Sequence, residues 1–358
     1  MDILVIGSGV SGLTTGVRLL EAGHRVAIVA RDLPPHTTSN VAAAIWEPFE
    51  AYPADRVAAW GAVAYREFLS LANDPRSGIH VADMLDVLPE PGPLPAWAQT
   101  VEGFRLADER ELPPGNAAGI AYRSPVIDMS RYLDYLLSRY RAAGGRSIQR
   151  PLMRLDDAFA QWDDLLGPSA ASNVPRVVVN CSGLGARELV PDAAVAPARG
   201  QVVRIAHSGF QQVLVQNTKG RPTYVVPRID DIVLGGTFDV GAENTTPDPA
   251  TRTDILMRCA ELALRADARF AMSLAALVGD DFARAFAARV PPEYADTPPA
   301  VISEEAVGLR PISPRVRVEA ERLAPDRLVV HNYGHGGAGV TLSWGCAAEV
   351  AQLVNARA

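Results

Sequence analysis

The sequence predicts an α/β protein in which a Rossmann-like dinucleotide-binding domain is joined to a second domain that contains an antiparallel sheet. Two observations carry this prediction. A glycine motif follows the first apolar run of the chain, and a group of short β-type runs with hairpin spacing lies further along. The length of 358 residues suits two domains.

The chain opens on a strand, turn, helix and strand. Residues 3–6 form an apolar run, an amphipathic helix pattern follows the turn, and residues 25–29 form a second apolar run. In this context Gly7 permits the tight turn, Gly9 lets a pyrophosphate approach the backbone, and Gly12 allows the helix to pack closely on the strand. The free N–H groups of the helix N-terminus attract phosphate. We therefore expect these residues to bind a dinucleotide: Gly7, Gly9, Val10, Ser11 and Gly12.

The ribose contact is open at this stage. After the second strand, the position where an acid would accept hydrogen bonds from the ribose hydroxyls holds Arg31 and Asp32. Either Asp32 makes this contact, or Arg31 contributes a charge or a backbone contact instead.

Later segments of the chain are also expected to belong to the nucleotide domain. Residues 129–143 read as a helix, residues 176–181 as a buried strand that enters a glycine turn, and residues 328–331 as a strand before a glycine loop and a last helix. The nucleotide domain is therefore expected to be discontinuous. It should comprise residues 1–50, 125–195 and 305–358, with a substrate-binding domain formed by residues 51–124 and 196–304.

The second domain is predicted from four short β-type runs. Residues 202–205, 213–215, 224–227 and 232–238 are rich in Val, Ile and Leu, and turn residues separate them. This spacing predicts an antiparallel sheet.

Composition excludes several classes of function. The net charge is −7 with no run of like charges, which argues against nucleic acid and membrane as partners. Lys219 is the single lysine and lies in a turn-like segment, so Schiff-base enzymes and Walker-type ATPases are set aside. No apolar stretch is long enough to span a membrane, and the start of the chain lacks the features of a signal peptide.

The cysteine and histidine patterns point away from disulfides and metals. Three cysteines, an odd number without a C-x-x-C pair, favour a reducing cytoplasm. His331 and His335 are separated by loop residues and have no third ligand nearby, so we expect no metal site. His335 should instead fix its loop by a hydrogen bond.

Six further segments make a family resemblance recognisable. They are Asn180-Cys181-Ser182-Gly183-Leu184-Gly185-Ala186, Arg199-Gly200-Gln201, Tyr224-Val225-Val226-Pro227, Leu234-Gly235-Gly236-Thr237, Val307-Gly308-Leu309-Arg310-Pro311 and the C-terminal Asn332-Tyr333-Gly334-His335-Gly336-Gly337 through Trp344-Gly345-Cys346-Ala347. In this order they resemble the D-amino-acid oxidases and their D-aspartate oxidase relatives. The resemblance extends from Met1 to about Val354 and is weakest between about residues 55 and 125.

The resemblance implies the cofactor and the reaction. It implies FAD, oxidation of a D-amino acid to an imino acid that gives the 2-oxo acid and ammonia, and reduction of oxygen to hydrogen peroxide. It also implies that Arg310 holds the substrate carboxylate as a bidentate pair with help from Tyr224, and that the carbonyl of Gly337 lies near the substrate amine. Hydride transfer from the α-carbon then needs positioning and no general base at that carbon.

The same resemblance implies further FAD contacts. By motif these are Thr37, Thr38, Ser39, Ala43, Ala44, Ile45, Ser182, Gly183, Gly336, Gly337, Gly339, Val340 and Thr341, in addition to the first glycine loop with Arg31 and Asp32.

Departures from the family pattern bear on the substrate. The segment before Tyr224 lacks the bulky lid tyrosine of many relatives, and Ala338 replaces an aromatic residue, so a roomier pocket is expected. Relatives that prefer D-aspartate or D-glutamate carry an arginine where this chain has Phe238, which favours neutral, apolar substrates. Glu47, Arg221 and Arg228 are charges whose place the sequence does not give.

Rival functions stay open from sequence. They are an acidic D-amino-acid oxidase, a glycine or sarcosine-type amine oxidase, a tailoring oxidase that acts on a larger amine, a flavin-binding protein without useful turnover, and an NAD(P)-dependent dehydrogenase. The dehydrogenase would not need the closing glycine loop and helix. The oligomeric state is also open, with a homodimer as one option.

Overall fold

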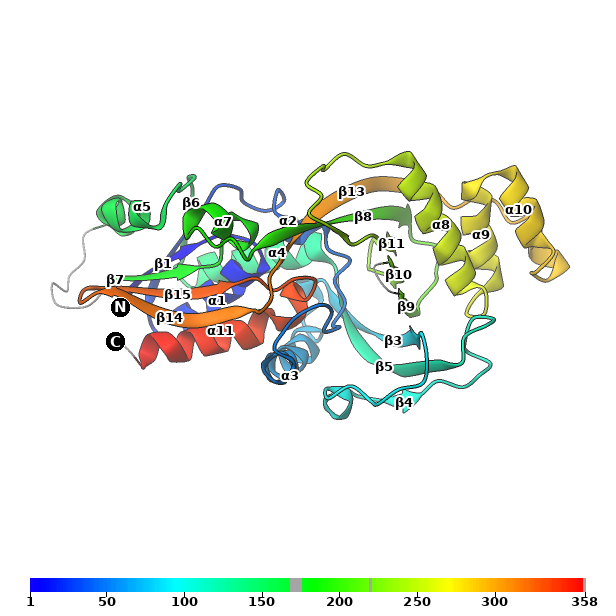
Figure 1. The fold of residues 1–358 in the computed structure, drawn as a ribbon, viewed down its shortest axis with the longest axis horizontal. Helices are drawn as coiled ribbons and strands as arrows, with labels where there is room; N and C mark the ends of the chain where they lie inside the picture. The colour runs from blue at the N-terminus through cyan, green and yellow to red at the C-terminus, as the bar shows by residue number, and fades with distance from the viewer. Residues whose placement is uncertain (168–175, 219–220, 357–358) are drawn as a thin grey trace.

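The computed structural model describes residues 1–167, 176–218 and 221–356. Lys219, and with it part of the segment in which the lid departs from the family pattern, lies outside these residues. Two sheets lie along the long axis of the molecule, with both termini at the end that carries the first sheet (Figure 1).

The first sheet has six strands in the order β14-β15-β7-β1-β2-β6. All neighbours are parallel except β14 and β15, which form an antiparallel pair at one edge. The strands are β1 (Asp2–Ile6), β2 (Arg25–Ala30), β6 (Arg146–Gln149), β7 (Arg176–Asn180), β14 (Arg317–Ala324) and β15 (Arg327–Tyr333). The predicted β-α-β unit is confirmed, because α1 (Val10–Glu21) connects β1 to β2 in parallel register.

Helices cover both faces of this sheet. Ile3 and Val5 point to one face and pack in a cluster with residues of α1, α4 (Met129–Ala142) and α11 (Gly339–Asn355). Leu4 and Ile6 point to the other face and pack with α5 (Leu155–Ala160) and α6 (Trp162–Leu166). This two-sided burial explains why the parallel strands are continuous apolar runs in the sequence.

The second sheet has nine strands and is mostly antiparallel, as the hairpin spacing predicts. Its order is β12-β8-β11-β10-β9-β3-β5-β4, and β13 pairs with β8. The strands are β3 (Ile79–Leu88), β4 (Arg105–Leu106), β5 (Ala118–Ile127), β8 (Ala196–Ala206), β9 (Val213–Thr218), β10 (Arg221–Pro227), β11 (Asp231–Gly235), β12 (Asp239–Val240) and β13 (Ile302–Ile312).

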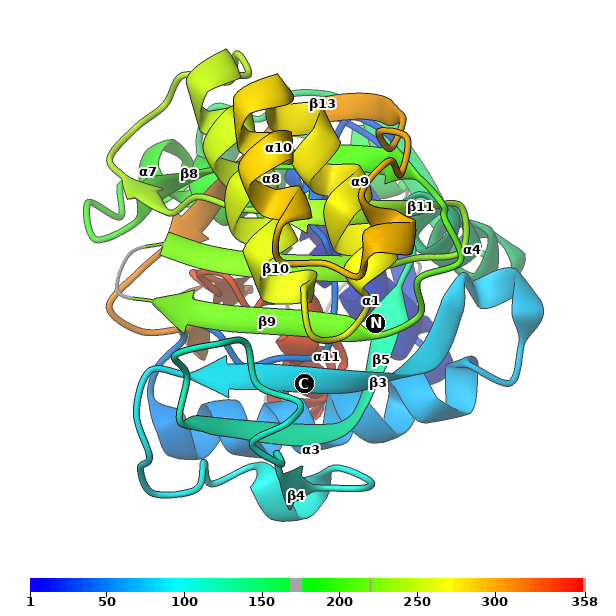
Figure 2. The same cartoon turned by 90° about the vertical axis from the view of Figure 1, so that its right-hand side faces the viewer.

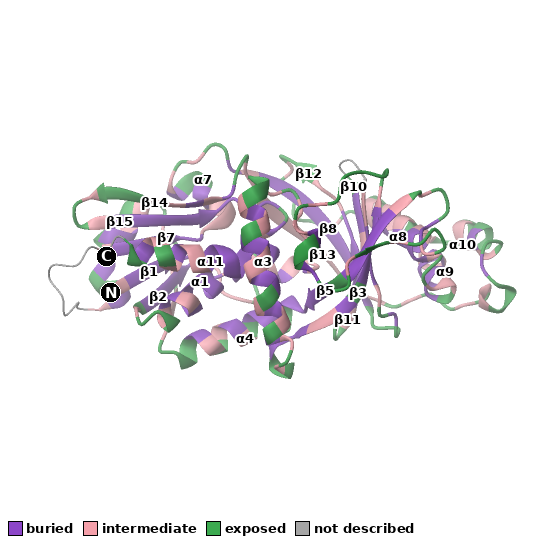
Figure 3. Ribbon diagram, turned by 90° about the horizontal axis from the view of Figure 1, so that it is seen from below, coloured by how far each residue is buried: buried purple, intermediate pink, exposed green. Residues whose placement is uncertain are grey.

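The two faces of the second sheet have different neighbours. One face packs on α8 (Pro249–Ala263), α9 (Ala268–Val278) and α10 (Asp280–Ala287), which lie across β9, β10 and β11 in Figure 2. The opposite face shares its apolar cluster with the first sheet's helices and with α3 (Ala54–Leu71). Figure 3 shows buried strands running through both halves, whereas α10 is largely exposed at one end. The short helices α2 (Thr38–Val41) and α7 (Ala186–Leu189) lie near the junction.

The chain passes between the two sheets several times. Strands up to β2, then β6 and β7, and finally β14 and β15 belong to the first sheet, and the intervening strands belong to the second. The predicted domain limit at residue 305 falls within β13, which pairs with β8 of the second sheet over most of its length. The domain limits given above remain a prediction.

Cys181, Cys259 and Cys346 are buried free thiols. Within the described ranges, no group of three or more His, Cys, Asp or Glu side chains is arranged to hold a metal ion. No helix of the same ranges has both the length and the apolar character needed to cross a membrane.

Candidate active site

A cavity of about 920 Å³ runs between the two sheets. Its wall combines the turn between β1 and α1, the segment after β2, the turn after β7, and the loop before α11. The carboxyl ends of parallel strands therefore meet at this cavity, as is general for ligand sites in open α/β sheets.

Two glycines of the first glycine loop, Gly7 and Gly12, leave no room for a side chain. Gly7 has a φ of +108°, and a Cβ there would lie 2.3 Å from the carbonyl oxygen of Cys181. A Cβ on Gly12 would lie 1.9 Å from the carbonyl oxygen of Gly7. Gly9 differs, because its Cβ would meet only the Ser39 hydroxyl at 3.0 Å and the residue lines the cavity. The three glycines thus have the turn, approach and packing geometry that the motif predicts.

Polar contacts fix the segments that face this loop. The Val10 N–H donates to the Ser39 hydroxyl at 3.1 Å, and the Ser8 hydroxyl donates to the carbonyl of Asp32 at 2.5 Å. The Arg31 guanidinium pairs with the Asp32 carboxylate at 2.7 Å, and both side chains are exposed at the cavity rim. The Asp32 carboxylate is therefore held by Arg31 at the rim of the cavity.

A smaller cavity of about 110 Å³ adjoins the first and contains Arg310 and Tyr224. Both residues, together with Ala43, Gly337 and Val340, line the two cavities at once. The structure therefore brings Arg310 and Tyr224, which are far apart in the sequence, to the junction of the two cavities.

Glycines of neighbouring strands make space for these two side chains. A Cβ on Gly200 would lie 2.0 Å from Nη1 of Arg310, so the guanidinium lies directly over the β8 backbone. A Cβ on Gly235 would lie 2.0 Å from the ring of Tyr224. Gly200 and Gly235 belong to the Arg-Gly-Gln and Gly-Gly-Thr segments, which gives these motifs a physical role.

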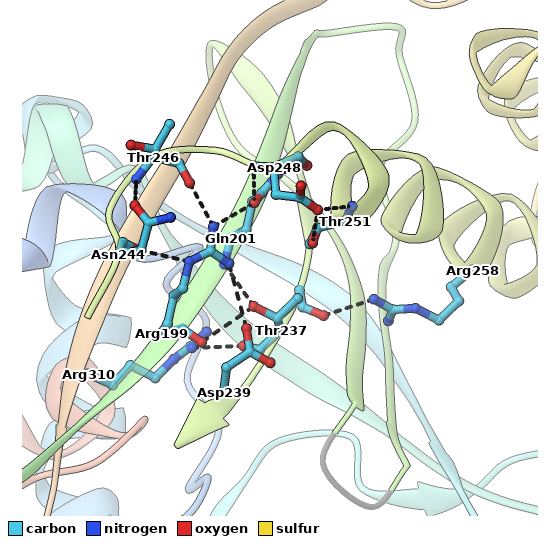
Figure 4. A network of polar contacts seen from close by, with 11 residues as sticks. Arg199, Gln201, Thr237, Asp239, Asn244, Thr246, Asp248, Thr251, Arg258 and Arg310 are labelled. Carbon is cyan, nitrogen blue, oxygen red and sulfur yellow. Dashed lines mark hydrogen bonds and ion pairs between the residues drawn. The ribbon is translucent and has the colours of Figure 1, made fainter. Parts of the chain in front are cut away.

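A polar network holds Arg310 from behind (Figure 4). Nη1 of Arg310 donates to the carbonyl of Thr237 at 2.9 Å, and the Thr237 hydroxyl accepts from the Gln201 N–H at 3.1 Å. Gln201 in turn donates to the carbonyl of Asp248, and Arg199 donates to the carbonyls of the adjoining loop. One N–H group of the guanidinium is thus fixed by the protein, and the Arg310 side chain lines both cavities.

Phe238 contacts this arginine and also Phe49, which lines the smaller cavity with Gly337. The Arg310 guanidinium lies 5.7 Å from the centre of the Phe238 ring, which meets Phe49 edge-on at 5.6 Å. A Cβ on Gly337 would lie 2.5 Å from the Phe49 ring, so only glycine fits there. Burial raises the pKa of the Tyr224 hydroxyl, and the neighbouring Arg310 partly offsets this increase, so the phenol stays protonated at neutral pH.

The loop before α11 is fixed by His335 and Thr341. His335 is buried, its Nε2 lies 3.0 Å from Oδ1 of Asn332, and burial lowers its pKa to about 4. The hydrogen bond that the sequence predicts for His335 is therefore present. The Thr341 hydroxyl donates to the carbonyl of Glu47 at 2.8 Å and accepts from the Glu47 N–H at 3.2 Å.

The structure also places the other residues that were expected at the site. Gly12 lies behind the loop and does not line either cavity, in agreement with its packing role. The remaining expected residues line one cavity or both: Gly7, Gly9, Val10, Ser11, Arg31, Asp32, Thr37, Thr38, Ser39, Ala43, Ala44, Ile45, Ser182, Gly183, Tyr224, Arg310, Gly336, Gly337, Gly339, Val340 and Thr341.

Three charges that the sequence left unplaced now have positions. Arg221 is exposed and pairs with Asp254, and Arg228 is buried against Asp231. Glu47 lines the smaller cavity, together with Asn217 and Phe49, which the sequence did not single out. No local signal marks Asn217, because it reaches the cavity only through strand pairing.

The larger cavity fits a dinucleotide such as FAD. Gly7 and Gly9 line it at the glycine loop, where they present backbone without a side chain. The N-terminus of α1 faces it, as phosphate groups require. The N-terminus of α11 also faces it, and its Gly339 and Val340 lie next to the smaller cavity.

Comparisons with known proteins agree with this geometry. The family model described as FAD dependent oxidoreductase matches residues 2–353. A D-amino-acid oxidase of Rubrobacter xylanophilus is 42% identical over 355 residues, which cover 99% of this chain and 95% of the relative. A human D-aspartate oxidase is 32% identical over 367 residues, covering 99% of this chain and 94% of the relative.

Solved structures share the fold at low identity. A glycine oxidase from Bacillus cereus superposes with a TM-score of 0.71 at 17% identity, over 100% of this chain and 95% of that structure. An L-α-glycerophosphate oxidase from Mycoplasma pneumoniae with FAD bound has a TM-score of 0.67 at 13% identity, over 99% of this chain and 94% of that structure. With the family model and the relatives at 30% identity or more, these findings show that the chain belongs to the FAD-dependent oxidoreductase family of the D-amino-acid oxidases.

Proposed function

We propose that this protein oxidises D-amino acids with neutral or apolar side chains at the junction of the two cavities, with Arg310, Tyr224 and Gly337 as the residues that position the substrate. The products are an imino acid, which hydrolyses to a 2-oxo acid and ammonia, and hydrogen peroxide from oxygen. The observation that carries the proposal is the pairing of Arg310 with Tyr224 where the smaller cavity opens into the dinucleotide cavity.

Arg310 binds the substrate carboxylate. Its Nη1 is held by the Thr237 carbonyl, so the guanidinium keeps one orientation. A planar guanidinium matches a carboxylate with two parallel charge-assisted hydrogen bonds, and lysine lacks this fork. The protonated Tyr224 hydroxyl donates a further bond to the same carboxylate, which fixes the remaining rotation of the substrate.

The amine is held from the opposite side. The carbonyl of Gly337 is the acceptor that the glycine loop offers at this junction, and the lack of a Cβ lets the loop approach Phe49 closely. A substrate held at both its carboxylate and its amine presents one fixed α-hydrogen to the larger cavity. FAD, when bound, takes up the two electrons of the oxidation and passes them to oxygen.

The start of α11 stabilises negative charge next to this point. Gly339 and Val340 line the larger cavity at the helix N-terminus, where unpaired N–H groups and the helix dipole favour an anion. The Thr341 hydroxyl is engaged with Glu47, so we expect this helix to act through its backbone N–H groups.

The wall residues favour substrates without a second carboxylate. Phe238 packs on Arg310 where acidic-substrate relatives carry an arginine, so this position offers a second carboxylate an apolar ring instead of a cation. We further propose a cytoplasmic location, which the three buried free thiols support.

The direct test is anaerobic mixing of the purified protein with D-methionine, L-methionine, D-aspartate and sarcosine in turn. We expect D-methionine alone to bleach the visible flavin spectrum, and admission of air should then release peroxide. Bleaching by L-methionine would contradict the handedness, and bleaching by sarcosine or D-aspartate would favour one of the rival oxidases. A protein that neither carries nor takes up a yellow cofactor would contradict the cofactor assignment.

The oligomeric state is a separate proposal. We propose a homodimer as the state to test by light scattering, since the fold leaves it open. A monomer at assay concentration would contradict it without affecting the reaction.

A further inference from the structure

An arginine outside both cavities is bonded to the strands that carry the substrate-binding residues. Arg258 belongs to α8, which packs on the face of the second sheet opposite to the cavities. Side chains alternate between the two faces of β10, so that Val225 packs with α8 and Val226 packs in the apolar cluster of the other face. By the same alternation Thr223 points toward α8, and Tyr224 points away from it to the cavity. Arg258 therefore approaches β10 from the side opposite to the Tyr224 ring.

The Arg258 guanidinium bridges two segments of the sheet. Its Nη1 donates to the carbonyl of Pro222 at 2.9 Å and to the Thr223 hydroxyl at 2.5 Å. Its Nη2 donates to the carbonyl of Gly236 at 2.9 Å, and Figure 4 shows the guanidinium reaching that segment from α8. Its Nε donates to the Asp254 carboxylate of the same helix at 2.9 Å, which balances the charge. One side chain thus joins the start of β10 to the residue that follows β11.

These contacts lie next to the groups that hold the substrate carboxylate in the proposed reaction. Thr223 directly precedes Tyr224 in the chain. Gly236 directly precedes Thr237, whose carbonyl accepts the hydrogen bond from Arg310 at 2.9 Å. The Tyr224 hydroxyl also lies over the Gly236 backbone, since a Cβ there would come within 2.6 Å of it. The same guanidinium thus holds the backbone that supports both substrate-binding side chains.

Two glycines beneath the Tyr224 ring explain why this backbone needs support from outside. A Cβ would lie 2.0 Å from the ring at Gly235 and 2.6 Å from the hydroxyl at Gly236, so both positions exclude a side chain. Glycine backbone is conformationally permissive, and it has no side chain of its own to anchor it. The two carbonyls are instead bonded from α8, because Cys259 Sγ donates to Gly235 at 3.7 Å and Arg258 donates to Gly236 at 2.9 Å. The contacts from α8 therefore fix a segment that must consist of glycine to make room for the phenol.

We propose that Arg258 is a positioning residue for the proposed reaction. It fixes the relative position of Tyr224 and Arg310, so that both side chains bind the same carboxylate without rearrangement. A planar guanidinium donates to both backbone segments at once, whereas the single nitrogen of a lysine cannot reach both with this geometry. The inference rests on the proposed function, because it requires a carboxylate bound between these two side chains.

The first test compares Arg258→Met with Arg258→Lys in the steady-state oxidation of D-methionine. Methionine keeps the apolar stem but none of the hydrogen bonds, so kcat/KM should fall about tenfold, mostly through KM. Lysine keeps the charge and one of the contacts and should lower kcat/KM about threefold. FAD content should stay at the wild-type level in both variants, because Pro222, Thr223 and Gly236 do not line the dinucleotide cavity. Arg258→Lys is used in the comparisons below if Arg258→Met yields no folded protein.

Arg252→Met is the matched control. Arg252 is an arginine of the same helix that pairs with Glu305 at 2.9 Å and lies outside both cavities. Its replacement also removes an ion pair of α8, but kcat/KM should stay within about twofold of wild type. Denaturant unfolding of both variants measures the stability that each arginine contributes.

A ligand without an amine reports on the carboxylate site without turnover. Hexanoate binding to the holoenzyme is followed by the shift of the flavin spectrum. We expect the Kd of hexanoate to rise about tenfold in Arg258→Met and to stay unchanged in Arg252→Met.

A double-mutant cycle with Arg310→Lys separates positioning from a general loss of structure. Once the guanidinium fork of Arg310 is lost, the support behind it matters less. Adding Arg258→Met should then lower kcat/KM by a further factor of about three at most. A purely structural role would multiply the two losses, so a further loss of about tenfold would overturn the inference.

The remaining outcomes separate this inference from the proposed function. Wild-type kinetics and hexanoate binding in Arg258→Met, or losses that Arg252→Met reproduces, would overturn the inference and leave the proposed function in place. A wild-type flavin that D-methionine does not reduce would count against the proposed function instead.

Discussion

The dinucleotide cavity and the substrate cavity are built by different means. The glycine loop of the first is shaped by backbone packing, since Gly7 and Gly12, which lie within six consecutive residues, leave no room for a Cβ. The second is formed by side chains such as Arg310 and Tyr224, which meet because distant strands pair in a given register. A cofactor common to many enzymes can be held by local backbone geometry, whereas substrate choice depends on side chains that can change one at a time.

We expect the largest effect of a single substitution in the glycine loop of the dinucleotide cavity. Gly12→Ala places a Cβ 1.9 Å from the Gly7 carbonyl, and no side-chain rotation can relieve a contact with backbone. We expect FAD retention to be lost and the free energy of unfolding to fall by about 3 kcal/mol or more. Absorbance of the purified protein and chemical denaturation measure the two effects.

The matched controls are Gly92→Ala and Gly9→Ala. Gly92 has open space around its Cβ position and should tolerate alanine. Gly9→Ala should weaken FAD binding but leave apoprotein stability close to that of wild type, because its Cβ meets only the Ser39 hydroxyl. Normal FAD content in Gly12→Ala would show that the region is less dependent on backbone packing than we infer.

We expect the second largest effect in the substrate cavity, at Arg310. Arg310→Lys keeps the positive charge but loses the guanidinium fork, so kcat/KM for D-methionine should fall about 100-fold, mostly through KM. FAD content should be unchanged, in contrast to Gly12→Ala. Arg221→Lys, an exposed arginine of β10, serves as control. Unchanged kinetics in Arg310→Lys would contradict the carboxylate assignment.

His335 belongs to the loop that both cavities share, and its effect should depend on pH. Its pKa is lowered from 6.5 to about 4, so below pH 6.5 the unfolded chain binds a proton that the folded chain does not. Stability from this residue is therefore present above pH 6.5 and is lost as the pH falls toward 4. Between pH 7.5 and 5.0 the loss should be about 2 kcal/mol.

His335→Gln keeps a hydrogen-bond donor and removes the titration. The variant should be less stable than wild type at pH 7.5 but should lose about 2 kcal/mol less on acidification, which denaturant unfolding at the two pH values measures. Equal losses in both proteins would show that His335 does not stay neutral when buried.

The smallest effect is expected for Tyr224→Phe. It removes one hydrogen bond to the carboxylate while Arg310 and the ring packing over Gly235 remain, so kcat/KM should fall about fivefold, or about 1 kcal/mol. Steady-state peroxide release measures it. A loss as large as that of Arg310→Lys would mean that the two side chains act as one unit.

The geometry of the first glycine loop can be predicted from the sequence for a physical reason. The turn at Gly7 and the packing at Gly12 depend mainly on the residues of the motif itself. The glycine spacing is therefore sufficient to predict the turn and the close packing of the helix. The antiparallel pairing of β8 to β11 is also predictable, because alternating strands and turn residues are local signals. The family resemblance supplies Arg310 and Tyr224.

Other features of the fold and of the site could not be predicted from the local sequence. The helix α3 lies where the resemblance is weakest and was not predicted, although its buried residues follow a helical spacing that could have indicated it. Asn217 reaches the cavity only through the register of β9 with β10. Glu47 could be noticed as a charge but not placed, since its position depends on contacts with Thr341 and Asn217.

The burial of the three thiols has a consequence for an enzyme that releases peroxide. Peroxide attacks the thiolate form of cysteine, and burial raises the pKa of Cys181 and Cys259 to about 12 and that of Cys346 above its usual range. Cys181 lines the larger cavity, yet burial raises the pKa of its thiol to about 12, so the thiol stays protonated at neutral pH. We therefore expect these three thiols to resist oxidation by the peroxide that the enzyme releases.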